Sequence, residues 1–243
     1  MPTNSKPEAE HSLCYRHTYF ESKWIQFWMR LAGLSPMGRI ATRMAAFFAH
    51  PHKARVYLAG MNPKGYVSSR AVIHHSDLHL GARVFIDDRV VIFQRETGGR
   101  IVVGNRVYIY RDTILETGEG GTLTIGDESS IHPRCQINAY LASINIGARV
   151  MIGPNCAFYS YDHGFAPDQP IDSQPLQSKG SIVVGDEAWL GFGVIVLSGV
   201  HIGSGAAVGA GSVVIDHIPE GAIASGNPAR VLKMRSDLKL KSI

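Results

Sequence analysis

The sequence has few cysteines, no long apolar run and no dense basic cluster. Its three cysteines form no CxxC pair and no disulfide framework, which favours a reducing compartment. No apolar stretch is long enough to span a bilayer, and residues 1–18 are too polar for a signal peptide, so we expect a cytoplasmic protein. The net charge of +4 is diffuse, which argues against a nucleic-acid partner and allows an anionic small ligand or a membrane surface.

Residues 1–60 are predicted to be a helical N-terminal region, in which residues 1–18 form no ordered element. Apolar residues recur at three- and four-residue spacing from Thr18, and after a break at residues 33–36 the pattern resumes until Phe48. The stripe of the first helix consists of Phe20, Trp24, Phe27, Trp28 and Leu31. It either packs against the rest of the protein or a partner subunit, or docks on a membrane as an interfacial helix. The basic residues on the polar side would then be Lys23, Arg30, Arg39 and Arg43.

A six-residue period organises the chain from residue 61 onward. In residues 184–214 an aliphatic residue returns at every sixth position, namely Val184, Leu190, Val196, Ile202, Val208 and Val214. This period fits neither a helix nor a long flat strand, but it fits short strands joined by tight corners, with one inward side chain per strand. Each unit then buries its apolar residue against its neighbours. The pattern predicts a parallel β-helix.

The period groups the chain into triplets of inward residues. The earlier triplets are predicted to be Met61, Val67 and Ile73; Leu80, Ile86 and Ile92; Val103, Ile109 and Leu115; Ile125, Ile131 and Ile137; Ile146, Ile152 and Phe158. Extra residues fall only between triplets, hence always at the same corner of a triangular coil. We therefore expect about seven coils of three hexads each. Cys135 and Cys156 occupy the small corner position of a hexad and are expected to be buried.

The longest insertion, residues 159–183, is the main candidate for a functional segment. Long loops in a compact repeat are usually functional, because they lose conformational entropy and add little core. His163 stands at the root of this loop, five residues after the inward Phe158, so the scaffold fixes its position. A histidine that titrates near neutral pH at such a place suits proton abstraction. From the residues alone, an ordinary surface histidine is an equal alternative.

His74, His75 and His79 form a weaker candidate for a metal site. Neighbouring residues of a strand point to opposite faces, and no carboxylate or matching histidine is evident in an adjacent coil. We therefore expect no bound metal.

The hexads, the stretch YDHGF, the segment PIDSQPLQSKGSIVVGDEAWLG and the closing IASGNPARVLK resemble the hexapeptide-repeat acetyltransferases. The resemblance is greatest to the branch that acetylates sugars and polysaccharides, such as maltose, galactoside, colanic-acid and O-antigen acetyltransferases. It implies an all-β fold, a left-handed parallel β-helix that works as a homotrimer with active sites between subunits. The expected domains are the helical region 1–60, a β-helical acyltransferase domain 61–218, and a closing segment 219–243 with a short tail helix.

The resemblance also implies roles for individual residues. His163 matches the family's catalytic histidine, a general base that takes the proton of the acceptor hydroxyl as it attacks acetyl-CoA. Coenzyme A in the family lies along the C-terminal coils, and Trp189 matches a tryptophan near the catalytic histidine. Arg230 and Lys233 match basic residues that could hold the CoA phosphates. The full set expected to contact CoA is Trp189, Gly191, Gly209, Ala210, Gly211, Arg230 and Lys233.

The sequence departs from the family in two places. Many relatives carry an asparagine where this chain has His132, and Asn138 one hexad later is an alternative. Together with Asp162, these residues are the candidates for acceptor or oxyanion contacts. A Thr-Lys pair that is often near the CoA phosphates is replaced by Ile215-Asp216.

The predicted function is O-acetylation of a sugar hydroxyl, in a surface polysaccharide or its precursor, with acetyl-CoA as donor. One alternative is an N-acetyltransferase of a nucleotide-linked amino sugar, although the N-terminus has no glycine-rich strand-to-helix turn for a nucleotide. A lyase like the γ-type carbonic anhydrases would need three histidines on zinc between subunits. The last alternative is a non-catalytic scaffold.

Overall fold

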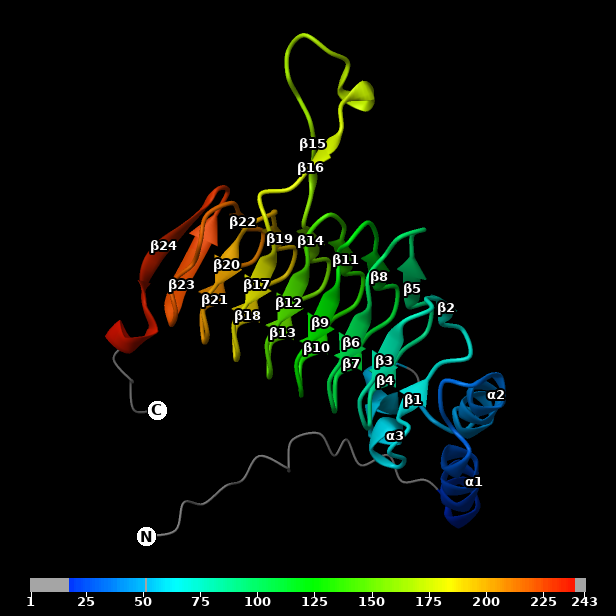
Figure 1. The fold of residues 1–243 in the computed structure, drawn as a ribbon. Coiled ribbons are helices and arrows are strands. Elements are labelled where there is room, and N and C mark those ends of the chain that lie inside the picture. The colour runs from blue at the N-terminus through cyan, green and yellow to red at the C-terminus, as the bar shows by residue number, and fades with distance from the viewer. Residues whose placement is uncertain (1–17, 51, 239–243) are drawn as a thin grey trace.

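The computed structural model describes residues 18–50 and 52–238. Its main body is a three-sided solenoid of short parallel strands, with helices at one end and a long loop at one corner (Figure 1). The predicted parallel β-helix is therefore confirmed. The expectation for the N-terminal tail falls on residues 1–17, which lie outside the described residues.

The sides of the solenoid are three sheets, named here A, B and C. Sheet A contains β1 (Tyr66–Val67), β4 (Phe85–Ile86), β7 (Tyr108–Ile109), β10 (Ser130–Ile131), β13 (Met151–Ile152), β18 (Trp189–Leu190), β21 (Ala207–Val208), β23 (Ala222–Gly226) and the antiparallel β24 (Ala229–Met234). Sheet B contains β2 (Val72–His74), β5 (Val91–Gln94), β8 (Ile114–Thr117), β11 (Gln136–Ala139), β14 (Ala157–Tyr159), β19 (Ile195–Val196) and β22 (Val213–Val214). Sheet C contains β3 (Leu78–Leu80), β6 (Ile101–Val103), β9 (Leu123–Ile125), β12 (Ile144–Ile146), β17 (Ile182–Val184) and β20 (His201–Ile202).

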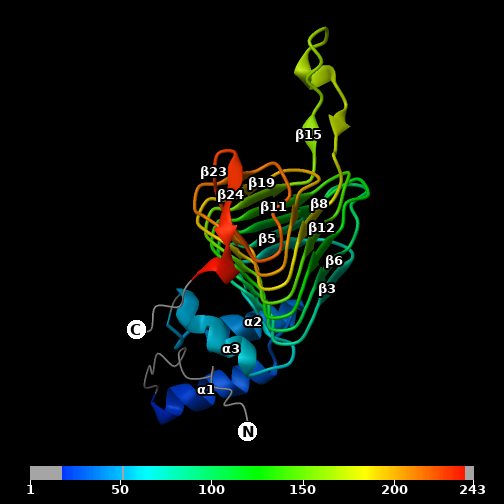
Figure 2. The same cartoon turned by 90° about the vertical axis from the view of Figure 1, so that its left-hand side faces the viewer.

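The solenoid is left-handed, as the family resemblance implies. Figure 2 views it from the C-terminal end, so the chain advances toward the viewer as it winds. It passes from sheet A on the left through sheet B at the top to sheet C on the right, which is a clockwise turn. Clockwise winding toward the viewer defines a left-handed coil, against the usual right-handed preference of parallel crossovers.

The core is a column of stacked aliphatic side chains. Inward residues of successive coils pair in register, as Ile131 does with Ile152 and Ile137 with Phe158. The predicted inward positions from residue 86 onward are all buried, and both Cys135 and Cys156 are buried as expected. The prediction failed only at the N-terminal end, where Met61 is 44% exposed because it caps a helix instead of lying in a strand.

The helical region packs on the first coils. It consists of α1 (Tyr19–Arg30), α2 (Pro36–Ala45), the 3-10 helix η1 (His52–Arg55) and α3 (Val56–Gly60). Thr18 begins α1 with a capping box, and Ser35 caps α2 before Pro36 at its first position. None of the helices in the described part of the chain has the length and apolarity to cross a bilayer.

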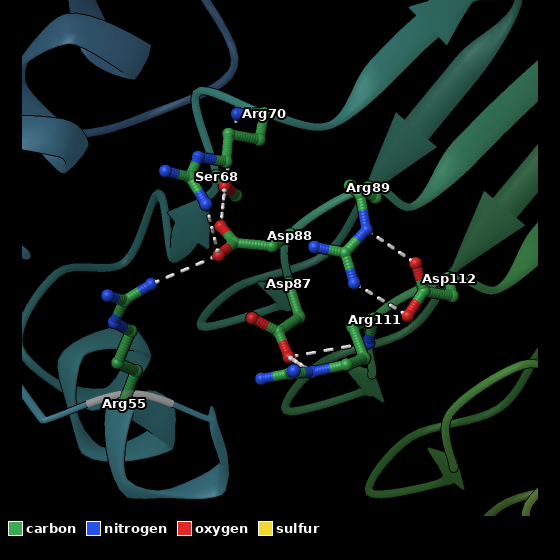
Figure 3. A network of polar contacts seen from close by, with 8 residues as sticks. All are labelled: Arg55, Ser68, Arg70, Asp87, Asp88, Arg89, Arg111 and Asp112. Atoms are coloured by element: carbon green, nitrogen blue, oxygen red, sulfur yellow. Dashed lines mark hydrogen bonds and ion pairs between the residues drawn. The ribbon is translucent and has the colours of Figure 1, made fainter.

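A second hydrophobic core and a polar network join these helices to the solenoid. The second core includes Ile25 and Met29 of α1 and Phe85 of β4. In the network, Arg55 of η1 forms an ion pair of 3.4 Å with Asp88, which also accepts a hydrogen bond from Ser68 (Figure 3). The helical region is therefore fixed to the A–B corner of the first coils.

The closing segment differs from the expected tail helix. Residues 222–234 form the antiparallel hairpin β23–β24, and the only helical element after it among the described residues is the 3-10 turn η3 (Arg235–Asp237). The hairpin covers the last coil through the pairing of β21 with β23. Sheet A is thereby extended past the last coil by two strands, and β21 is not left as an unpaired edge.

Candidate functional site

The long loop leaves the solenoid at the B–C corner, between β14 and β17 (Figure 1). This is the corner at which the sequence places all the insertions. The base of the loop is an antiparallel ladder of β15 (Asp162–His163) and β16 (Leu176–Gln177), in which His163 pairs with Leu176. Backbone hydrogen bonding therefore fixes the position of His163 relative to the coil.

The loop has its own polar core. Gln174 is buried, its Oε1 accepts from the amide of Ala166 at 2.7 Å, and its Nε2 donates to the carbonyls of Ala166 and Gln169. At the root, the Ser178 hydroxyl donates to the carbonyl of Ser160 at 2.6 Å. These hydrogen bonds satisfy backbone groups of the loop that would otherwise be hydrogen-bonded to water. They hold the loop in one conformation.

His163 presents an exposed imidazole at the base of this loop. The neighbouring Asp162 is directed to the next coil, where its Oδ2 accepts a hydrogen bond of 3.0 Å from the Ser198 hydroxyl. Adjacent residues of a strand point to opposite sides, so His163 faces away from this anchor. Within the described residues its side chain makes no hydrogen bond or ion pair, which leaves both ring nitrogens available to a substrate.

A tyrosine cluster that the sequence reasoning missed lies beside the loop root. The rings of Tyr140 and Tyr159 lie 5.2 and 6.0 Å from the ring of Tyr161, two residues before His163. Arg95 stacks over Tyr140 at 5.6 Å and pairs with Glu116. The available signal was the run YSYDH, in which two tyrosines precede the histidine at alternate positions.

Asn138, a candidate for contacts with the acceptor, lies close to the loop root, but its side chain is already hydrogen-bonded within the chain. Its amide nitrogen donates to Glu116 at 3.0 Å, and the residue is 8% exposed. Its buried Oδ1 has no partner among the described residues. Its backbone carbonyl accepts from the amide of Ser160, so Asn138 braces the root of the loop.

His132, the other acceptor candidate, lies at a different corner of the same chain. It follows β10 at the A–B corner, 3.4 Å from Lys53 and 5.1 Å from the ring of Tyr110. Burial lowers its pKa, and the nearby Lys53 lowers it further. A cavity of about 320 Å³ adjoins it, lined by Lys53, Asp87, Tyr110, Arg111, Asp112, Pro133 and Arg134. One chain therefore does not bring His132 and His163 together.

Trp189 is also remote from His163 within one chain. It lies on β18 with its side chain 46% exposed on the outer face of sheet A. In a triangular coil the B–C corner, from which the loop projects, lies across the core from sheet A (Figure 2). The exposed Trp189 on the outer face of sheet A therefore points away from the loop.

The packing of the A–B corner requires glycine at positions that were expected to contact CoA. A Cβ on Gly191 would lie 2.7 Å from the amide nitrogen of Ala210, and one on Gly209 would lie 2.6 Å from the Ser225 hydroxyl. Gly211 has a φ of +71°, which favours glycine. Close stacking of coils thus accounts for Gly191 and Gly209, whether or not CoA contacts them.

The two basic residues of the closing segment differ in their engagement. Arg230 forms an ion pair of 2.9 Å with Asp216, the residue that departs from the family's Thr-Lys pair. Lys233 is exposed on β24 and forms no ion pair within the described residues. A phosphate group could pair with Lys233 directly, but it would have to displace Asp216 to pair with Arg230.

Two of the three candidate metal histidines have other partners. His75 lies 2.9 Å from the Thr117 hydroxyl, and His79 lies 2.6 Å from Asp77. Within residues 18–50 and 52–238, no group of three or more His, Cys, Asp or Glu side chains is arranged to hold a metal ion.

Comparison with known proteins identifies the family. WbbJ of Escherichia coli strain K12, named as a lipopolysaccharide biosynthesis O-acetyl transferase, is 32% identical over 147 residues, covering 52% of this chain and 74% of WbbJ. The chain belongs to the hexapeptide-repeat acetyltransferase family. The galactoside O-acetyltransferase of Lactococcus lactis is 36% identical over 99 residues, covering 41% of this chain and 47% of that enzyme.

The chain spans about half the length of the first curated relatives that it matches. Among solved structures, the polySia-specific acetyltransferase NeuO superposes with a TM-score of 0.52 at 17% identity, covering 73% of this chain and 86% of NeuO. At that identity the likeness shows the shared fold. A scan against models of protein families gave no match.

Proposed function

We propose that the protein is an O-acetyltransferase that transfers the acetyl group of acetyl-CoA to a sugar hydroxyl, in a surface polysaccharide or its precursor. Membership of the hexapeptide-repeat acetyltransferases supports acyl transfer, and the two O-acetyltransferase relatives support a sugar acceptor. The observation that carries the proposal is His163, whose exposed imidazole stands unpaired on a braced loop base. In this proposal residues 61–218 are the acyltransferase domain of a cytoplasmic enzyme.

The chemistry needs one base and one site for the oxyanion. His163 accepts the proton of the acceptor hydroxyl while the hydroxyl oxygen attacks the thioester carbonyl. The tetrahedral oxyanion is stabilised by hydrogen-bond donors, and its collapse breaks the C–S bond. CoA leaves as a thiolate and takes the proton back from the imidazolium, so the products are the acetyl ester and CoA.

We propose that the site is completed by a second copy of the chain in a homotrimer. His163 and Trp189 point in opposite directions from one solenoid, so one chain cannot place both beside the same substrate. In the proposed cyclic trimer the B–C corner of one copy would face sheet A or the A–B corner of the next. His132 and the cavity beside it would then adjoin the neighbour's loop.

The substrate contacts follow from the exposed groups. The ring cluster of Tyr140, Tyr159 and Tyr161 offers aromatic faces to the apolar side of a sugar ring beside His163. Lys233 is the better candidate for the CoA phosphates, because Arg230 is already paired with Asp216.

Thiol release from acetyl-CoA, measured with a panel of neutral, acidic and amino sugars, tests the proposal. His163→Ala is expected to lower kcat by about 10²–10⁴-fold, with little change in CoA binding. His74→Ala, which alters a histidine on β2 in sheet B of the solenoid, is the matched control and should leave turnover unchanged. Retained turnover in His163→Ala would overturn the role of the base. Turnover only with amino sugars would replace O-acetylation by N-acetylation.

A further inference from the structure

The outer side of α1 carries a continuous apolar stripe. Phe20, Phe27 and Leu31 recur at intervals of seven and four residues, so they lie on one side of the helix. They are 63%, 56% and 56% exposed. Ile25 and Met29, which pack into the second core, lie on the opposite side. The stripe is therefore no part of the contact between α1 and the solenoid.

A second stripe follows α2 and the turn after it. Met37, Ile40 and Phe47 recur at intervals of three and seven residues and are 74%, 53% and 76% exposed. The buried side of α2 is formed by small residues, including Ala41 and Ala45. The larger apolar side chains Met37, Ile40 and Phe47 are thus on the outer side.

Ring contacts join the two stripes into one surface. The ring of Phe48 lies 6.0 Å from Phe20, 5.9 Å from Trp24 and 5.0 Å from Phe47. The Trp24 indole also donates a hydrogen bond of 2.7 Å to the carbonyl of Met44. Helices α1 and α2 form a helical hairpin, and we call this outer surface of it the hairpin face. It is formed by Phe20, Phe27, Leu31, Leu34, Met37, Ile40 and Phe47.

The charges around the hairpin face are almost all positive. In residues 18–50 the one acidic residue is Glu21, against Lys23, Arg30, Arg39 and Arg43. By helical position, Lys23 and Arg30 border the stripe of α1, and Arg43 borders that of α2. Arg39 is turned inward and donates to the carbonyls of Ser69 and Ala71.

We propose that the hairpin face docks on an anionic lipid bilayer. Exposed aromatic and aliphatic side chains enter the boundary between headgroups and acyl chains, while bordering cations pair with anionic headgroups. A second copy meeting the same face would bring Lys23, Arg30 and Arg43 against like charges, which is unfavourable. An anionic lipid surface satisfies both the apolar area and the charge.

Docking through this face leaves the acyl-transfer site open. The helices lie at one end and side of the solenoid, while the loop that bears His163 projects from the opposite side (Figures 1 and 2). A docked molecule therefore directs the loop away from the bilayer. Membrane binding and turnover of a water-soluble acceptor are expected to be separable.

Vesicle flotation of the full chain tests the proposal. We expect binding to phosphatidylcholine vesicles that contain phosphatidylglycerol, weaker binding to pure phosphatidylcholine, and loss of the difference at high salt. The double variant Phe27→Ser, Phe47→Ser should lower partitioning by about tenfold or more, because two rings no longer enter the bilayer. Arg30→Glu with Arg43→Glu should abolish the preference for anionic vesicles.

Phe165→Ser is the matched control, because Phe165 is 78% exposed but lies on the loop at the opposite side. It should bind vesicles like the parent chain, and thiol release with a soluble acceptor should be unchanged in the Phe27 and Phe47 variants. Equal binding of the parent to both vesicle types, or none, would overturn the proposal. So would a change of oligomeric mass in Phe27→Ser, Phe47→Ser with unchanged flotation, which would assign the face to a second copy.

Discussion

The Ser198 hydroxyl donates a hydrogen bond of 3.0 Å to Asp162, the residue beside His163. Ser198 lies at the B–C corner of the coil after the loop, so this bond ties the loop base to the following coil. Asp162 and His163 point to opposite sides of β15, so this hydrogen bond lies on the side of the loop base away from the imidazole. Its role is therefore to position His163.

Removing this tie should affect turnover more than binding. Ser198→Ala is expected to lower kcat by about tenfold while leaving KM for acetyl-CoA nearly unchanged, because a base displaced by less than an ångström loses alignment. Asp162→Asn, which can still accept from Ser198, should retain more activity. Ser173→Ala removes a hydroxyl bond at the loop tip and serves as control. Equal losses in both serine variants would mean that the loop as a whole, not this tie, governs turnover.

The inward and outward residues of a single strand should differ in their effect on stability. Ile152 is fully buried and Met151, its neighbour on β13, is 54% exposed. Ile152→Ala is expected to lower the free energy of unfolding by about 2–5 kcal/mol, because it leaves a cavity between stacked coils. Met151→Ala should change it by less than about 0.5 kcal/mol. Urea unfolding measures both, and equal effects would contradict the predicted alternation.

Close stacking of coils predicts different results at two glycines. Gly191→Ala places a Cβ 2.7 Å from the backbone nitrogen of Ala210, so the coils must shift and stability should fall by about 1–3 kcal/mol. Gly60→Ala meets no atom within 4 Å and should be neutral or stabilising. Thermal unfolding compares the two variants, and a neutral Gly191→Ala would show that the corner has room for a side chain.

The fold could be predicted from the sequence because each hexad repeats the same physical requirement. One aliphatic residue per strand must be buried against the next coil, so the pattern identified the strands around Ile131, Phe158 and Leu190 and the corner that holds every insertion. The prediction failed at Met61, where the repeat has no previous coil to pack on and the chain is helical. It also failed for the tail, because covering the last edge of sheet A is a tertiary requirement.

The candidate site could be predicted only in part. The spacing from Phe158 placed His163 at the base of the loop, since the insertion begins at a fixed corner. The triplets themselves separate the candidates around the coil, because Trp189 and His132 adjoin the middle residue of a triplet and His163 follows the third. Only the family resemblance brought Trp189 close to the histidine. The sequence reasoning also missed the Tyr161 cluster, whose members come from adjacent coils.

Two carboxylates near the A–B corner should affect the pH dependence of stability in opposite directions. Burial raises the pKa of Asp87, so its carboxyl group binds a proton more tightly in the folded chain than in the unfolded chain. The stability that this protonated carboxyl group contributes is lost as pH rises through the raised pKa. The hydrogen bond from Arg89 lowers the pKa of Asp112, so that contribution is lost as pH falls. Figure 3 shows both groups.

Urea unfolding of Asp87→Asn and Asp112→Asn at about pH 4 and about pH 7 measures these contributions. Relative to the parent chain, Asp87→Asn should gain more stability at the higher pH than at the lower. Asp112→Asn should lose more at the higher pH. Parallel pH profiles for the two variants would contradict the assignments.

The central claim is that His163 of one copy and Trp189 of another form one site. Co-expression of His163→Ala chains with Trp189→Ala chains, followed by thiol release on the purified mixed assemblies, tests it most directly. Random mixing should restore about a quarter of the parent activity, because a quarter of the interfaces join an intact histidine to an intact tryptophan. Mixed assemblies that form but show no more activity than either variant alone would contradict the shared site.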